Sequence, residues 1–167
     1  MPSDHAPLTD TVDRVRREWA QARPELDTTP IDVLGRVQRI ASVCNHRLDL
    51  DLARHGITRS EFSVLSALAR ADRPLRASEV VSTTMLSGAS ITKIAESLVR
   101  RGLLERKKSE HDGRVVLLEL TEAGLAIVDD EMPRRLADDQ RLIAGLSAAE
   151  RETLTGLLRK VCTALGE

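Results

Sequence analysis

Basic side chains gather between residues 93 and 114, and their number favours contact with a polyanion. This segment carries seven Lys or Arg residues against four carboxylates, a net charge of +3, whereas residues 117–140 carry two against seven, a net charge of −5. The whole chain balances 25 basic against 26 acidic residues, so attraction to a nucleic acid must come from this local patch.

Small polar side chains stand just before and within the patch, where a helix is expected to begin. At the N-terminal end of a helix, such groups can meet base edges and phosphates in a major groove about 12 Å wide. Farther along, Arg114 beside an Asp-Gly turn places one long cation at a protruding tip, which suits a narrow minor groove. The residues predicted to contact DNA are Ser87, Ser90, Thr92, Lys93, Arg100, Lys107, Lys108, Asp112 and Arg114.

Two of these residues also have a role within the chain itself. The alternative for Ser87 is that it is the N-cap of the helix and has no contact with DNA, although capping is compatible with a phosphate contact. Asp112 would act by orienting the turn or Arg114.

The hydrophobic spacing predicts a mostly α protein with a small β-hairpin, an α+β fold. Apolar residues recur at helical intervals in most of the chain, while both sides of the Asp-Gly turn alternate as strands do. Two short helices joined by a turn and followed by a hairpin form the order of a winged helix-turn-helix. Helices are expected over 9–23, 31–53, 58–71, 77–83, 87–101, 121–142 and 147–165, the sixth bent at Pro133, with strands over 103–108 and 115–120.

The composition excludes several classes of protein. Only Trp19 and Phe62 are aromatic, so the chain lacks the stacking platforms that hold single-stranded nucleic acid. No phosphate-binding loop, nucleophile elbow or His-Glu-x-x-His pair is present, so we expect no enzyme, no metal site and no cofactor. Without a signal-peptide pattern or a run of about 18 apolar residues, we expect a cytoplasmic protein with no membrane partner.

Four linked motifs in the second half of the chain resemble those of the MarR family of winged-helix transcription factors. The likeness extends over almost the whole chain. The motifs are the helix residues from Ser90 to Lys93, the Gly-Leu-Leu-Glu-Arg run ending at Arg106, the Asp-Gly-Arg turn ending at Arg114 and the Leu-Thr-Glu-Ala-Gly run ending at Gly124.

The resemblance implies a homodimeric, sequence-specific regulator of transcription that binds a palindromic double-stranded DNA operator. It implies a repressor more often than an activator, released by a small ligand. A single domain over 1–167 is implied, with dimerisation helices at 31–55 and 125–167 and the DNA-binding winged helix-turn-helix lobe at 57–124. The helix at 8–23 is an addition that resembles the urate-responsive branch of the family.

In that branch a tryptophan at this place helps to form a ligand pocket. The resemblance therefore implies that Trp19 and Arg106, with Ser63 beside them, bind a small aromatic or anionic effector. Ser63 stands where the branch has an aspartate and Ile94 where it has an arginine, so the identity of the effector stays open. Trp19 can instead be a dimer-core residue without ligand contact.

Two other functions stay open. Cys44 falls on the apolar face of its helix, but some family members sense peroxides through a cysteine in this half of the chain, so a redox-sensing regulator is one alternative. The other is a winged-helix module that binds another protein. The salt dependence of binding distinguishes this module from a DNA-binding protein. The logarithm of a DNA-binding constant falls with the logarithm of the salt concentration, by about 0.9 per neutralised phosphate.

Overall fold

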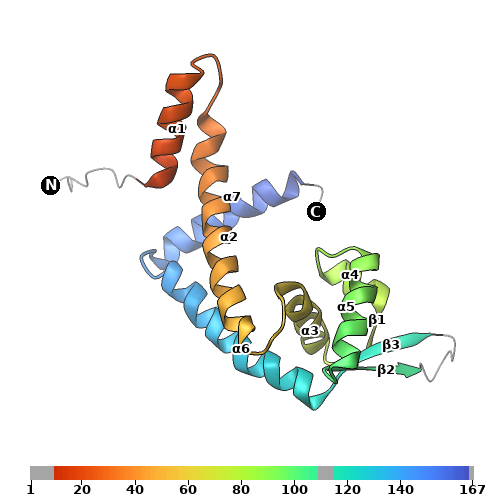
Figure 1. Ribbon diagram of the computed structural model, residues 1–167. Helices are drawn as coiled ribbons and strands as arrows, with labels where there is room; N and C mark the ends of the chain where they lie inside the picture. Colours follow the sequence, from red (N-terminus) through yellow and green to blue (C-terminus); the bar gives the residue numbers. More distant parts are fainter. Residues whose placement is uncertain (1–9, 109–114, 166–167) are drawn as a thin grey trace. The chain divides into compact units, whose positions relative to one another are not determined.

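The computed structural model describes residues 10–108 and 115–165, which fall into two compact units (Figure 1). The first unit ends at Arg47 and the second begins at Leu48, so the long helix α2 contributes to both. In chain order the elements are α1 (Thr11–Ala22), α2 (Thr29–Ala53), α3 (Arg59–Ala71), β1 (Leu75–Arg76), α4 (Ala77–Thr83), α5 (Gly88–Arg100), β2 (Leu104–Lys108), β3 (Val116–Leu120), α6 (Glu122–Leu142) and α7 (Ala148–Thr163).

The first unit pairs α1 with the beginning of α2. A capping box starts α1, in which the carboxylates of Asp10 and Asp13 each accept the backbone N–H of the other residue. Arg36 of α2 reaches both carboxylates, at 3.0 Å from Asp10 and 2.7 Å from Asp13. Gly35 permits this approach, because a Cβ there would lie only 2.9 Å from the side chain of Val12. Charge and a close glycine contact thus fix α1 on α2.

The second unit packs α3, α4 and α5 against a three-stranded antiparallel sheet. Strand β3 lies in the middle, and its Leu118 stands opposite Leu75 of β1 and Arg106 of β2. Apolar residues at helical spacing on α3 and α5 face the core, where Phe62 and Leu98 are almost completely buried. This core supports the helix-turn-helix, formed by α4 and α5, and the wing, which is the hairpin of β2 and β3.

The structure confirms the predicted α+β winged helix-turn-helix, with element bounds that agree to within two residues in the described part of the chain. One detail differs from expectation. Strand β1 is a third strand of only two residues, too short to leave an alternating pattern. Helix α6 continues across Pro133, a residue on the exposed side, and the bend expected there stays a prediction.

A tight contact joins the end of α5 to the start of α6. Thr121 caps α6 by accepting the N–H of Gly124 at 3.1 Å, and its hydroxyl donates to the carbonyl of Gly102 at 2.7 Å. A Cβ at Gly124 would lie 2.1 Å from the carbonyl oxygen of Leu103, so only glycine fits. The Leu-Thr-x-x-Gly motif is therefore a packing requirement.

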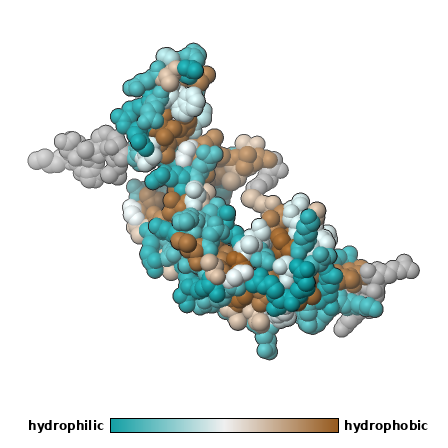
Figure 2. Space-filling model, in the orientation of Figure 1, coloured by the Kyte–Doolittle hydropathy of each residue, from teal (hydrophilic) through white to brown (hydrophobic). Residues whose placement is uncertain are grey.

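Apolar side chains remain exposed on helices of both units (Figure 2). Helix α7 has no buried residue, and Leu157 on it is 55% exposed. On α2, Ile40 is 59% exposed. Stripes of this kind mark surfaces that a partner covers. The exposed apolar residues on α2, α6 and α7 include Val33, Leu34, Val37, Ile40, Val43, Leu50, Leu136, Leu142, Leu154, Leu157, Leu158 and Val161.

Within the described ranges, every helix is too short or too polar to span a bilayer.

Candidate nucleic-acid interface

Helix α5 turns one face to the core and the other to solvent. Ile91, Ala95 and Leu98 are buried and hold the inner face. Lys93 and Arg100 lie on the exposed face, and neither forms an ion pair within residues 10–108 and 115–165. The helix therefore presents two cations without carboxylate partners among those residues.

The hydroxyl groups at the start of α5 have partners within the helix. Ser87 is the N-cap: its Oγ accepts the backbone N–H of Ser90 at 3.2 Å, and the two hydroxyl oxygens lie 2.9 Å apart. The hydroxyl of Thr92 donates to the carbonyl of Gly88 at 3.1 Å. A hydroxyl oxygen has two lone pairs, so each can accept a further bond while it serves the helix.

The wing divides its charged side chains between the two faces of the sheet. Alternation along β2 places Arg106 and Lys108 on the face that packs against α5, and Glu105 and Lys107 on the opposite face. Arg106 reaches Glu96 of α5 at 3.9 Å, as this placement requires. Arg106 and Lys108 are thus the basic residues of β2 that lie on the same side of the sheet as α5.

Lys107 is held by two carboxylates. Its ammonium pairs with Glu119 across the sheet and with Glu105 on its own strand, the latter at 3.2 Å. These hydrogen bonds, with Glu119 first, raise the pKa of Lys107 above its ordinary value. The three groups together carry a charge of −1, so this face of β2 offers no surplus positive charge. By contrast, Lys108 forms no ion pair with any residue that the structure describes.

Asp112 and Arg114 lie outside the described residues, with the rest of the turn between β2 and β3. Their roles at the tip of the wing stay predictions.

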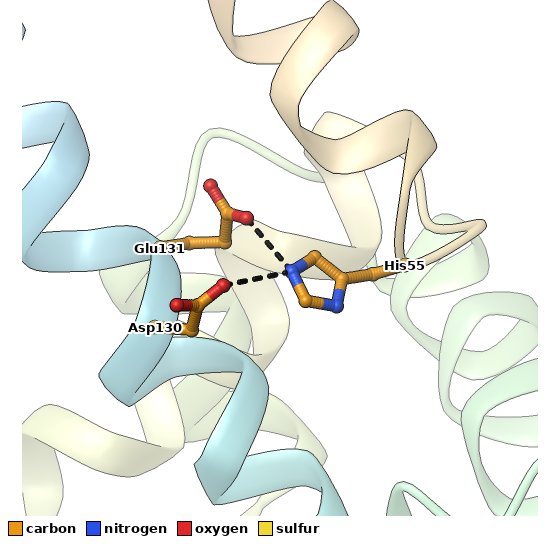
Figure 3. Close-up of side chains that lie close together, drawn as sticks. All are labelled: His55, Asp130 and Glu131. Carbon is orange, nitrogen blue, oxygen red and sulfur yellow. Dashed lines mark hydrogen bonds and ion pairs between the residues drawn. The ribbon is translucent and has the colours of Figure 1, made fainter.

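Two charged clusters beneath this interface have no counterpart in the sequence-based predictions. Arg101, the residue that ends α5, donates to the carboxylate of Glu61 at 3.3 Å and to the carbonyl of His55 at 3.2 Å. The ring of His55 in turn meets Asp130 and Glu131 of α6 (Figure 3). These partners are 40 or more residues apart in the sequence, so no local spacing could reveal them.

The cluster at His55 is a network of ion pairs between side chains of the protein. One ring nitrogen and one oxygen each from Asp130 and Glu131 lie within 4.8 Å of one another, the arrangement that a metal ion could use. However, Nε of Arg54 donates to the same Glu131 oxygen at 2.7 Å. A guanidinium cation at this point would repel a metal ion, so the donor set fits a salt-bridge cluster better.

Trp19 lies in a groove of about 450 Å³ between α1 and α2. Its side chain is 49% exposed, and most of the other lining is apolar, with Thr11, Gln38 and Arg39 as polar residues. Such a groove suits a small aromatic molecule with a polar substituent. The lining residues are Thr11, Val12, Val15, Trp19, Pro30, Ile31, Leu34, Gly35, Gln38 and Arg39.

The other predicted effector contacts lie on the surface of the second unit. Ser63 is exposed on α3, and its hydroxyl donates to the carbonyl of Arg59 at 2.9 Å. Arg106 is on β2, as described above. Cys44 is half-buried in α2 and Cys162 is exposed on α7, and both are free thiols. The effector and redox roles of these residues stay predictions.

Known proteins resemble this chain over most of its length. A protein-family sequence model described as MarR family matches residues 55–115 of the chain. The HTH-type transcriptional regulator MhqR of Bacillus subtilis is 33% identical over 130 residues, which cover 77% of this chain and 86% of that protein. The HTH-type transcriptional regulator PecS of Dickeya dadantii is 26% identical over 152 residues, which cover 90% and 92%.

Solved structures of DNA-binding regulators also resemble this chain. One of them, from a study of how 6-hydroxynicotinic acid regulates the DNA binding of Bordetella bronchiseptica BpsR, is 29% identical, with a TM-score of 0.66. The likeness covers 78% of this chain and 92% of that chain.

Proposed function

The chain belongs to the MarR family of HTH-type transcriptional regulators, and we propose that it is a homodimeric repressor that binds a palindromic DNA operator. Repression follows from steric occupation of a promoter. The proposed place of action is the cytoplasm. A small aromatic or anionic effector releases the protein from DNA.

The observation that supports DNA binding most strongly is the exposed face of α5. Lys93 and Arg100 stand there without carboxylate partners among the described residues, while the opposite face is anchored in the core. Hydroxyl groups at the N-terminal end of the same helix can accept or donate further hydrogen bonds. A helix of this kind enters the major groove with its N-terminal residues at the base edges.

The exposed apolar stripes on α2, α6 and α7 support a homodimer. A second copy of the chain would cover them, and a twofold axis would then relate two copies of α5. Recognition helices in successive major grooves lie about 34 Å apart, so the operator is an imperfect palindrome of roughly 16 to 20 base pairs.

The groove at Trp19 supports effector binding. Its mostly apolar lining, with the polar side chains of Thr11, Gln38 and Arg39, suits an aromatic compound that carries a polar or anionic group. An effector lowers operator affinity only if it binds more tightly to a form of the dimer that does not fit both half-sites. Because Trp19 is the single tryptophan, its fluorescence reports occupation of this groove directly.

The test is a titration of the purified protein with the DNA that flanks its own gene, at several salt concentrations. Arg100→Gln has a matched control in Arg70→Gln, since each arginine is exposed in the last turn of a 13-residue helix. Arg100→Gln should weaken binding and lower the salt slope by about 0.9, the value for one phosphate. Arg70→Gln should leave both unchanged. Equal behaviour of the two variants would contradict the proposed use of α5.

A further inference from the structure

Residues 54–58 join α2 to α3, and we call them the junction. The chain turns here through Gly56, whose φ of +62° is a conformation that favours glycine. Arg101 at the end of α5 donates to the junction backbone, and Glu131 of α6 accepts from the junction side chains. One short segment thus contacts both the proposed recognition helix and α6.

On the α5 side, the contact depends on a buried carboxylate. Glu61 is 8% exposed, and its Oε2 accepts the backbone N–H of Thr58 at 2.9 Å. Its Oε1 accepts the Ser97 hydroxyl at 3.1 Å and the Arg101 guanidinium at 3.3 Å. The second terminal nitrogen of Arg101 donates to the carbonyl of His55 at 3.2 Å. Without Arg101, the Glu61 charge would stay buried with no cation beside it.

On the α6 side, two residues of the junction share one acceptor. Glu131 is 1% exposed, and its Oε1 is 2.7 Å from both Nε of Arg54 and Nε2 of His55. The same ring nitrogen lies 3.4 Å from Asp130, so both contacts converge on it (Figure 3). A hydrogen bond from Arg134 lowers the pKa of Asp130, and the charges of Arg54 and His55 act in the same direction. This keeps Asp130 ionised beside the junction.

These bonds supply what apolar packing cannot. The buried face of α5 holds the helix against the core, but apolar contact is non-directional. Hydrogen bonds between charged groups fix both distance and direction. At 13 residues, α5 is about 20 Å long, so a tilt of about 3° at its end moves the opposite end by about 1 Å. A shift of that size is enough to spoil contacts in the major groove.

We propose that Arg101 is a positioning residue, which fixes the end of α5 to the junction, and through the junction to α6, without contacting a phosphate itself. The inference rests on the proposed DNA-binding function. It assigns different roles to two adjacent arginines: Arg100 reaches the DNA backbone, whereas Arg101 reaches Glu61 and the junction.

The experiment measures operator affinity against salt for the wild-type dimer and for Arg101→Gln, Arg100→Gln, Glu61→Gln and the Arg101→Gln/Glu61→Gln double variant. Arg101→Gln should weaken binding about tenfold at every salt concentration, with an unchanged slope. Arg100→Gln should lower the slope by about 0.9. Glu61→Gln retains the cap on Thr58 and is buried away from DNA, yet it should weaken binding, and the double variant should be no weaker than Arg101→Gln alone.

Arg101→Lys can still reach Glu61 but cannot also reach His55, so it should restore part of the affinity. All titrations are run well below the melting temperature of each variant. If Arg101→Gln lowered the salt slope of operator binding as Arg100→Gln does, Arg101 would contact a phosphate and the proposal would be overturned. Unchanged affinity with a lowered melting temperature would show a role in stability only, and would overturn it as well. If the wild-type dimer prefers no duplex over random DNA, the proposed function fails first.

Discussion

Replacement of Gly124 by alanine tests whether the joint between the wing and α6 is as tight as its geometry indicates. The new Cβ would lie 2.1 Å from the carbonyl oxygen of Leu103 and 3.1 Å from a methyl carbon of Leu120. The carbonyl cannot turn away freely, because it accepts the backbone N–H of Thr121 at 3.3 Å. Helix α6 and the start of β2 must therefore separate by about 1 Å to accommodate one methyl group.

The expected loss of stability is large for a single methyl group. Overpacking of a closed site costs about 1–3 kcal/mol, and here the obstacle is a backbone carbonyl, so we expect about 3 kcal/mol. For a chain of this length, that loss lowers the melting temperature by roughly 6–12 °C. The separation also displaces the wing, so operator affinity should fall together with stability.

The assay is thermal and urea unfolding of both proteins at one fixed concentration, since dimer formation contributes to the measured stability. Gly145→Ala is the matched control, because a Cβ at Gly145 meets nothing within 4 Å. The control should unfold within about 0.5 kcal/mol of the wild-type protein. If Gly124→Ala were as stable as the control, the tight joint, and with it the physical reason for the Leu-Thr-x-x-Gly motif, would be refuted.

Three further predictions concern the wing and α1. Lys108→Gln should lower the salt slope of operator binding by about 0.9, whereas Lys107→Gln should leave it unchanged, since two carboxylates hold Lys107; equal slopes would contradict the division between the faces of β2. Gly35→Val should dislodge α1, seen as a shift in Trp19 emission, and an unchanged spectrum would refute the close contact. A backbone N–H and a guanidinium lower the pKa of Asp13 below its ordinary value of 3.8, so its stabilisation of α1 should be complete above that pH and be lost as the pH falls through the lowered pKa. Trp19 emission should report this acid transition, and Asp13→Asn should remove it.

The fold followed closely from local patterns. The spacing of apolar residues predicted helix bounds that the structure reproduces to within two residues, and capping boxes begin α3 at Thr58 and α7 at Ser147. These signals are local, because a cap or an apolar stripe is decided within one or two turns of helix. Strand β1 escaped prediction because a strand of two residues owes its existence to its partner β3 and not to its own sequence.

The site was less accessible to sequence reasoning. The exposed cations of α5 could be found from amphipathic spacing alone, since the apolar face fixes which residues point outward. The fate of Lys107 could not, because its partner Glu119 is on another strand and only the register brings them together. Arg101 and Glu61 escaped for the same reason, as their pairing depends on how α3 and α5 pack. Positions whose role depends on a distant partner need the tertiary structure.

The most direct test of the central claim is whether α5 occupies the major groove in two half-sites of one operator. Dimethyl sulfate methylates guanine N7, which faces the major groove, so a bound recognition helix protects it. We expect two clusters of protected guanines about 10 base pairs apart, symmetric about the centre of the operator. Arg101→Gln should weaken the protection without moving it. Specific, salt-sensitive binding that leaves every N7 reactive would contradict the proposed use of α5.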